Sequence, residues 1–153
     1  MNTKIKIVNN GINDFKYANE GDSGFDIRAN HDAIVYPNDV KLIKTGFFVE
    51  MPTGIELQVR SRSGLALKKK ITVLNSPGTV DASYRGEIGV ILKNDSSEPF
   101  EIFRGDRIAQ GVFAKVEYPL LTVTTEPLSQ SEADSRLVLR TSEIVIPDEV
   151  PPM

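Results

Sequence analysis

The sequence contains no cysteine and only one histidine. Without cysteine the chain can form no disulfide, present no thiolate nucleophile and build no zinc site on sulfur ligands. The single histidine, His31, cannot supply a histidine-rich metal site, and we expect it at the surface or in a turn. Any metal binding or catalysis in this chain must therefore use other residue types.

Long apolar runs and an excess of positive charge are also missing. No uninterrupted apolar span approaches the roughly 20 residues that a membrane helix needs. Residues 1–7 alternate polar and apolar side chains, unlike a signal peptide, so we expect a cytoplasmic protein with no membrane partner. The formal net charge of -3 at pH 7 argues against general nucleic-acid binding, which needs a basic face. We interpret the lysines at 68–70 as a solvated turn.

The composition is that of an ordinary globular domain, because 40% of the 153 residues are hydrophobic and 25% are charged. Short runs that alternate polar and apolar residues, or are rich in β-branched residues, are separated by turn residues throughout. They predict strands at residues 4–8, 23–29, 33–36, 40–51, 55–60, 71–74, 88–92, 100–103, 108–116 and 120–125.

Many short strands at regular spacing predict an all-β sandwich or barrel. Strand periodicity alone does not choose between immunoglobulin-like and jelly-roll topologies. The one candidate helix lies within residues 61–69 and has one or two turns. We place a β-barrel domain at residues 1–125. Residues 126–153 are predicted to form an arm that is extended or partly disordered, or that crosses to a neighbouring subunit.

The segment at residues 75–87 lies between two apolar runs and predicts a β-hairpin with an enlarged loop. A Pro-Gly pair and an Arg-Gly pair form its bends. Between them the loop carries a carboxamide (Asn75), a carboxylate (Asp81) and a phenol (Tyr84). Functional residues are common on loops that rigid strands support, so this loop is a candidate substrate pocket.

Other polar residues have chemistry suited to phosphate groups. Arg62, Ser63 and Gly64 offer a guanidinium, a hydroxyl and a flexible backbone at the start of the candidate helix, where backbone amides favour an anion. Arg107 and Gln110 place a guanidinium and a carboxamide on one strand. Each of these features alone occurs by chance in many proteins.

Two carboxylates stand in a strand-like context. Asp26 and Asp81 are each flanked by apolar residues. Brought together, two carboxylates can bind a hydrated divalent cation and orient a water. An aspartate in a strand is more often an ordinary exposed carboxylate, so this feature too is weak by itself.

The order and spacing of these features resemble the motifs of the trimeric dUTPase family, the deoxyuridine triphosphate nucleotidohydrolases. The matching stretches are residues 23–29 (Ser-Gly-Phe-Asp-Ile-Arg-Ala), 62–66 (Arg-Ser-Gly-Leu-Ala), 78–86 (Gly-Thr-Val-Asp-Ala-Ser-Tyr-Arg-Gly) and 105–110 (Gly-Asp-Arg-Ile-Ala-Gln). The resemblance covers roughly the first four-fifths of the chain. It implies a jelly-roll-like β-barrel that forms a homotrimer with shared active sites, and hydrolysis of dUTP to dUMP and pyrophosphate.

The resemblance also implies roles at the nucleoside end. Asp81 matches the carboxylate that orients the attacking water. Asn75, with the backbone around it at Gly78 and Val80, matches the group that reads the uracil edge. Tyr84 matches the ring under the deoxyribose, where a ribose 2′-hydroxyl would collide. A site that recognises uracil in this way rejects cytosine. Cytosine has hydrogen-bond donors and acceptors reversed relative to uracil, so polar groups buried in the complex would be left unpaired.

At the phosphate end the implied roles are those of charge and hydrogen bonding. Ser63, Gly64 and Gln110 match groups that bind the phosphates, and Arg62 fits either a phosphate contact or a structural ion pair. Asp26 matches a carboxylate that holds Mg²⁺ through its water shell. A triphosphate carries dense negative charge, which magnesium, arginine and backbone amides offset.

The chain departs from the family pattern in three places. Ser61 stands where the second motif usually has Pro, which we expect to lower loop rigidity, and Lys70 stands where Gly is common. The family also ends in a Gly-rich arm with an Arg, a Phe and a Ser or Thr that closes over the nucleotide. Here no glycine follows Gly111 and no phenylalanine follows Phe113. An arm without glycine cannot easily wrap a phosphate, so we predict that the site binds dUTP but turns over slowly.

Two alternatives stay open. A dCTP deaminase-related enzyme shares the fold but needs a catalytic glutamate on the strand after the hairpin, and residues 88–92 contain none. A non-catalytic module that binds a nucleotide and regulates a protein partner is the other, and the unusual tail keeps it in consideration.

Overall fold

The computed structural model describes residues 3–130 of the chain. Contacts divide the chain after Tyr118, and the strands and the helix of the described residues all belong to the first unit, Met1–Tyr118. Within the described residues, one short helix, α1 (Ser63–Lys69), follows the sixth strand. The strands are β1 (Lys6–Asn9), β2 (Phe25–Arg28), β3 (Ala33–Val35), β4 (Val40–Lys44), β5 (Phe47–Glu50), β6 (Ile55–Arg60), β7 (Ile71–Val73), β8 (Gly78–Val80), β9 (Gly89–Asn94), β10 (Phe100–Ile102) and β11 (Arg107–Lys115).

None of the helical structure in residues 3–130 has the length and apolarity that crossing a membrane would require.

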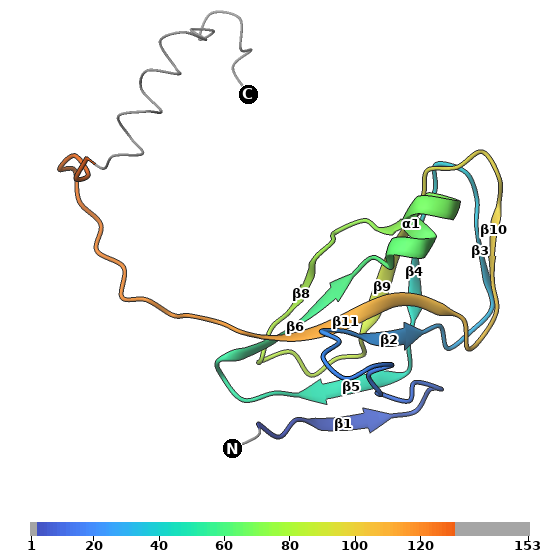
Figure 1. Cartoon of the computed structure of the whole chain (residues 1–153), viewed down its shortest axis with the longest axis horizontal. Coiled ribbons are helices and arrows are strands. Elements are labelled where there is room, and N and C mark those ends of the chain that lie inside the picture. Colours follow the sequence, from blue (N-terminus) through green and yellow to red (C-terminus); the bar gives the residue numbers. More distant parts are fainter. Residues whose placement is uncertain (1–2, 131–153) are drawn as a thin grey trace, which may run out of the picture. The chain divides into compact units, whose positions relative to one another are not determined.

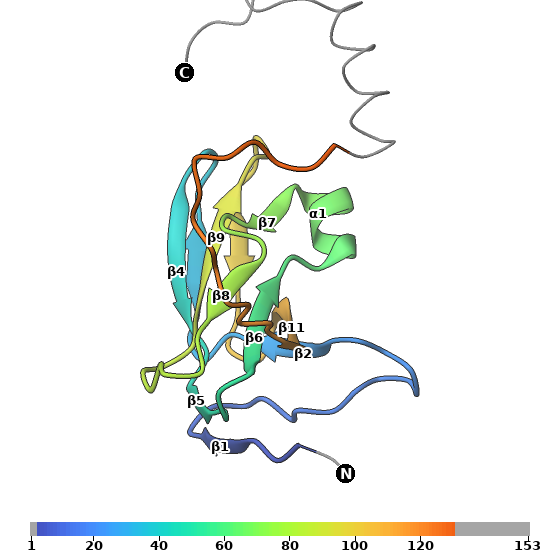
Figure 2. The same ribbon diagram turned by 90° about the vertical axis from the view of Figure 1, so that its left-hand side faces the viewer.

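The strands pair antiparallel in four groups, which Figures 1 and 2 show from two sides. The groups are β2–β11–β6–β8, β4–β9–β7, β1–β5 and β3–β10. β11 lies between β2 and β6, so that Gln110 has Asp26 on one side and Arg60 on the other. This is a jelly-roll-like β fold, and the predicted all-β class is confirmed.

A single apolar core holds these strands together. In β2, Phe25 and Ile27 are buried while Asp26 and Arg28 are half-buried on the other face, as the alternation in the sequence predicts. Fully burying an aliphatic or aromatic side chain stabilises a fold by roughly 1.5–3 kcal/mol. The largest fully buried side chains include Phe47, Ile27, Ile43, Leu57, Ile71, Ile88, Leu92, Ile102 and Ile108.

The prediction of one strand over residues 40–51 is wrong. The segment divides into β4 and β5, which belong to different sheets. The chain bends at Gly46, whose φ of 79° is accessible to glycine but strained for residues with a side chain. Beside it, Thr45 is fully buried, and its hydroxyl donates a hydrogen bond to the carbonyl of Ile88 at 2.5 Å.

The predicted hairpin is confirmed, and its loop contains one more strand. β7 and β9 pair antiparallel, with Val73 opposite Leu92. Inside the loop, β8 pairs with β6 of the four-stranded sheet, which puts Gly78 opposite Val59. The loop is therefore attached to two sheets, and its polar residues are held between them.

The prediction of a strand at residues 120–125 is also wrong. The segment has no regular structure, and Leu120, Leu121 and Val123 are 96, 79 and 95% exposed. A sequence with strand character becomes a strand only where a neighbouring strand satisfies its backbone hydrogen bonds. The predictions made for residues 131–153 lie outside the described part of the chain.

Candidate functional site

The residues predicted at the nucleoside end surround one cavity. Asn75, Gly78, Val80, Asp81 and Tyr84 all line a hollow of about 190 Å³ formed by the loop between β7 and β9. The remaining lining residues are Val59, Val73, Thr79, Glu87, Ile88 and Gly89. The valines at 59 and 73 and the isoleucine belong to the buried core, so the polar residues stand on a rigid floor.

The ring of Tyr84 is positioned by its own loop. The Tyr84 hydroxyl donates to the carbonyl of Glu87 at 2.8 Å, and the Tyr84 N–H donates to the carbonyl of Asp81 at 3.0 Å. The ring lies over Gly86, where an added Cβ would come within 2.5 Å of the Tyr84 hydroxyl oxygen. A larger residue at position 86 would displace the ring, so the Arg-Gly pair is needed for its placement. With 46% of its surface exposed, Tyr84 is a wall of the cavity and not a core residue.

Arg85 connects the same loop to β5. Its Nε lies 3.6 Å from Oε1 of Glu50. Its Nη1 also donates to the carbonyls of Ala82 and Tyr84. The ion pair is about half exposed on both sides and so contributes little by itself, but the two carbonyl contacts shape the bend that carries Tyr84.

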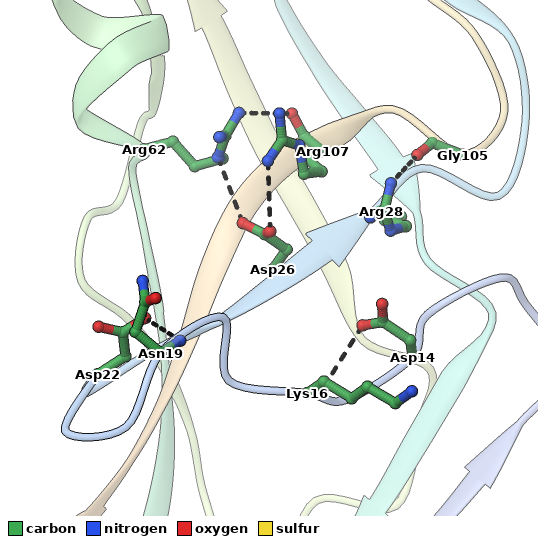
Figure 3. A network of polar contacts seen from close by, with 9 residues as sticks. All are labelled: Asp14, Lys16, Asn19, Asp22, Asp26, Arg28, Arg62, Gly105 and Arg107. Carbon is green, nitrogen blue, oxygen red and sulfur yellow. Dashed lines mark hydrogen bonds and ion pairs between the residues drawn. The ribbon is translucent and has the colours of Figure 1, made fainter.

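Asp26, Arg62 and Arg107 form a charged cluster beside β2 and β11 (Figure 3). Asp26 Oδ1 lies 3.4 Å from Nε of Arg62, and Asp26 Oδ2 lies 3.7 Å from Nη1 of Arg107. Arg62 Nη1 also donates to the carbonyl of Arg107 at 3.4 Å. One carboxylate is thus shared by two guanidinium groups from distant parts of the chain. Of the two roles open to Arg62, the structural ion pair is present.

Gln110 lies next to this cluster and faces a second cavity. Its Cα is the direct cross-strand partner of Asp26, and its Nε2 donates to the carbonyl of Ser61 at 3.1 Å. A cavity of about 270 Å³ is lined by Asp26, Gln110, Ser23 and Gly24, together with Lys16, Ala18 and Asp22. The first and fourth predicted motifs therefore meet at one hollow.

The second motif reaches the cavity beside Gln110 only through the contact of Arg62 with Asp26. Arg62 is the N-cap residue of α1, and Ser63 and Gly64 form the exposed first turn of that helix. In the part of the chain that the structure describes, none of these three residues lines the nucleoside cavity or the cavity beside Gln110. A single chain thus brings together the nucleoside residues, but not all of the predicted phosphate residues.

Comparison with known proteins decides the family. The dUTPase family model matches residues 10–141. A deoxyuridine 5'-triphosphate nucleotidohydrolase of Picosynechococcus is 56% identical over 108 residues, covering 71% of this chain and 76% of the relative. The same enzyme of Helicobacter pylori strain Shi470 is 46% identical over 135 residues, covering 88% of this chain and 92% of the relative. The chain belongs to the dUTPase family.

Solved structures of phage dUTPases share its fold. A variant of the dUTPase from phage phi11 of Staphylococcus aureus matches with a TM-score of 0.76 at 22% identity, covering 83% of this chain and all of that one. A variant of the Staphylococcus bacteriophage 80alpha dUTPase with dUpNHpp matches with a TM-score of 0.77 at 24% identity, covering 86% and 94%. At these identities the likeness supports the jelly-roll-like fold.

Within this dUTPase, the structure gives Ser61 a place that the sequence does not indicate. The Ser61 N–H donates to Oγ of Ser76 at 3.1 Å, and Ser61 Oγ accepts from the N–H of Val73 at 2.8 Å. Its carbonyl accepts the bond from Gln110 described above. A proline at position 61 could make only the last of these bonds. The partners are distant in sequence, so no local pattern reveals them.

The sequence also left Glu87 unassigned, although its side chain lines the nucleoside cavity. Its Oε2 accepts a hydrogen bond from the N–H of Gly46 at 3.0 Å. These two residues are 41 positions apart, and the only local signal is that an acidic residue directly follows the third motif.

The described residues offer a magnesium ion single carboxylates and no cluster of ligands. Among residues 3–130, no group of three or more His, Cys, Asp or Glu side chains could hold a metal directly. Asp26, the predicted magnesium carboxylate, has both oxygens facing arginines. Mg²⁺ usually keeps several waters and is bound by one or two carboxylates plus substrate phosphates. The arrangement suits a cation that the triphosphate itself carries.

Proposed function

We propose that this chain hydrolyses dUTP to dUMP and pyrophosphate by attack of a water on the α-phosphate. The observation that carries the proposal is the nucleoside cavity. Its lining includes the residue expected to recognise uracil (Asn75), the residue expected to exclude ribose (Tyr84) and the expected catalytic carboxylate (Asp81). The relatives named above as deoxyuridine 5'-triphosphate nucleotidohydrolases support the same activity.

In this proposal Asp81 is the catalytic residue. Its carboxylate is exposed at the cavity and so can reach a water. A carboxylate within hydrogen-bond distance of that water takes its proton as the oxygen attacks phosphorus. Asp81 comes directly after β8, whose pairing with β6 fixes the position of its backbone.

Substrate choice is assigned to the rest of the loop. Asn75 and the backbone of Gly78 and Val80 read the uracil edge, and the Tyr84 ring occupies the space that a ribose 2′-hydroxyl would need. A buried hydrogen-bond pattern of this kind rejects a base with reversed donors and acceptors strongly, because its polar groups are left unpaired. The buried core side chains under the cavity hold these recognition groups in fixed positions.

Phosphate binding is assigned to Arg62, Ser63, Gly64 and Gln110. Asp26 is the residue that would contact Mg²⁺, through water, while its two arginines hold the carboxylate in place. When bound with the triphosphate, Mg²⁺ neutralises phosphate charge that the protein would otherwise have to offset alone.

We further propose a homotrimer with shared active sites. The supporting observation is that Ser63 and Gly64 do not line the nucleoside cavity of their own chain. Residues 1–125 form the barrel domain of each subunit in this proposal, residues 126–153 form the arm, and the enzyme works in the cytoplasm without nucleic-acid or membrane partners.

The test is a nucleotide panel assayed with Mg²⁺. We expect pyrophosphate release from dUTP at a kcat/KM far above that from dCTP, dTTP and UTP. Ammonia released from dCTP would instead indicate the deaminase, and tight dUTP binding without any pyrophosphate would indicate the regulatory module. Either result would overturn the proposed hydrolysis.

A further inference from the structure

Glu87 is a half-buried carboxylate at the edge of the nucleoside cavity. It ends the loop at residues 75–87 and lies on the cavity wall together with Asp81 and Tyr84. None of the roles assigned above uses its side chain. The same side chain nevertheless makes a contact with a distant part of the fold.

That contact attaches the end of the loop to the turn between β4 and β5. The N–H of Gly46 donates to Glu87 Oε2 at 3.0 Å. The next residue reinforces the attachment, since Ile88 donates its N–H to the carbonyl of Phe47 at 2.9 Å and accepts the hydroxyl of Thr45 at 2.5 Å. Of these three bonds, only the one to the Glu87 carboxylate depends on the identity of a loop side chain. A charged acceptor makes such a bond stronger than a neutral one.

The backbone of Glu87 holds the Tyr84 ring in turn. Its carbonyl accepts the Tyr84 hydroxyl at 2.8 Å. The ring is nearly half exposed, so burial fixes it only in part. The ring also lies beside Gly86, the residue directly before Glu87, where an added Cβ would come within 2.5 Å of the Tyr84 hydroxyl oxygen. Any movement of the backbone at residues 86–87 therefore moves both of these neighbours of the ring together.

We propose that Glu87 is a positioning residue that sets the Tyr84 ring and thereby the selection of deoxyribose over ribose. The proposal rests on the proposed dUTP hydrolysis. The carboxylate of Glu87 holds the backbone at residues 86–87 against the β4–β5 turn, and this backbone holds the ring where a 2′-hydroxyl would collide. Without the carboxylate, the N–H of Gly46 loses its acceptor, residues 86–87 move, and the ring withdraws from that place.

The other end of the loop does not depend on Glu87. Asn75 follows β7, its neighbour Ser76 accepts the N–H of Ser61 at 3.1 Å, and β8 is paired with β6. Uracil reading is therefore kept when the Glu87 bond is lost. This separation distinguishes positioning of Tyr84 from a general structural role, because general loosening would weaken both kinds of selection.

The test compares kcat/KM for dUTP, UTP and dCTP in Glu87→Ala, Glu87→Gln and wild type. In Glu87→Ala the dUTP-to-UTP ratio is expected to fall about tenfold, the equivalent of one lost hydrogen bond, while the dUTP-to-dCTP ratio is unchanged. Glu87→Gln keeps an oxygen acceptor for Gly46 and is expected to restore the ratio to within about twofold. Glu101→Ala, at an exposed glutamate on β10, is the matched control.

A second variant removes the other bond of this arrangement, the one between the Tyr84 hydroxyl and the Glu87 carbonyl. Tyr84→Phe keeps the ring but removes the donor to the Glu87 carbonyl, and is expected to give the same loss of ribose rejection even if Glu87→Ala does not fold. An unchanged dUTP-to-UTP ratio in a folded Tyr84→Phe or Glu87→Ala variant would overturn the proposal. So would an equal fall in both ratios, or a Glu87→Gln variant as unselective as Glu87→Ala. Calorimetric affinities for dUTP and UTP give the ribose ratio without turnover, so failure of hydrolysis and failure of positioning are distinguishable.

Discussion

Asp26 Oδ1 lies 3.4 Å from Nε of Arg62, and this contact joins the first and second motifs of a dUTPase. The other oxygen of Asp26 faces Arg107 of the fourth motif at 3.7 Å. Three stretches that are separate in the sequence are thus connected through one carboxylate. The side chains of Asp26 and Arg62 are 31 and 25% exposed, so water and salt screen this pair only in part.

Replacing Asp26 by Asn removes the charge that both arginines face. We expect a loss of about 1 kcal/mol of unfolding free energy, near the upper end for ion pairs of this exposure, and a higher KM for dUTP with Mg²⁺. Urea denaturation at a single protein concentration and steady-state kinetics measure the two effects. Asp14→Asn is the control, because Asp14 is exposed and its one polar contact within residues 3–130 is a long hydrogen bond from the N–H of Lys16, at 3.4 Å. Equal stabilities of the two variants would contradict the connecting role of Asp26.

Ser61→Ala removes an acceptor from a partly buried backbone donor. The N–H of Val73 then has no partner, and an unpaired buried donor costs about 1–3 kcal/mol. We expect that loss in urea denaturation, with a larger loss for Ser61→Pro because the bond to Ser76 disappears as well. Ser97→Ala, at an exposed serine between β9 and β10, should leave stability within about 0.5 kcal/mol. A Ser61→Pro variant as stable as wild type would show that these bonds matter little.

Two leucines provide a test of the core. Leu57 in β6 is fully buried, whereas Leu67 in α1 is 83% exposed. Leu57→Ala should destabilise the fold by about 2–5 kcal/mol through lost contacts and the cavity left behind. Leu67→Ala should change stability by about 0.5 kcal/mol or less. Thermal or urea unfolding of both variants measures this difference, and similar losses would mean that β6 is not in the core.

The tail leads to a kinetic prediction. Because residues 126–153 contain no glycine, we expect an arm of this composition to give slow turnover at normal dUTP affinity. Exchanging residues 126–153 for the Gly-rich arm of another dUTPase should raise kcat by at least about tenfold, the scale of one donor to the reacting phosphate. Single-turnover and steady-state kinetics of the exchange protein measure this. A wild-type kcat equal to that of a family member with the Gly-rich arm would contradict the prediction.

The sequence predicts strands and loops correctly where neighbouring residues alone determine the structure. The alternation of Phe25 and Ile27 with polar residues matches the buried and exposed faces of β2. The apolar runs around residues 75–87 pair as β7 and β9. The motifs locate five of the residues that line the nucleoside cavity, Asn75, Gly78, Val80, Asp81 and Tyr84, because that cavity is built mainly from one continuous loop.

Local pattern fails where distant partners decide the outcome. Residues 40–51 are continuous in strand character, and only Gly46 hints at the bend between two sheets. Residues 120–125 have strand character but no paired neighbour within the described structure. The bonds of Ser61 and the side-chain bond of Glu87 reach partners 12 to 49 residues away, which periodicity cannot show.

The most direct test of the proposed hydrolysis is a comparison of wild type with Asp81→Asn, measuring pyrophosphate release from dUTP and dUTP affinity by calorimetry. Asparagine has nearly the same shape as aspartate but cannot take a proton from the attacking water. We predict that wild type hydrolyses dUTP, and that the variant loses hydrolysis by at least about 100-fold while its dUTP affinity stays within a few-fold. Hydrolysis by Asp81→Asn at the wild-type rate would contradict the catalytic role of Asp81.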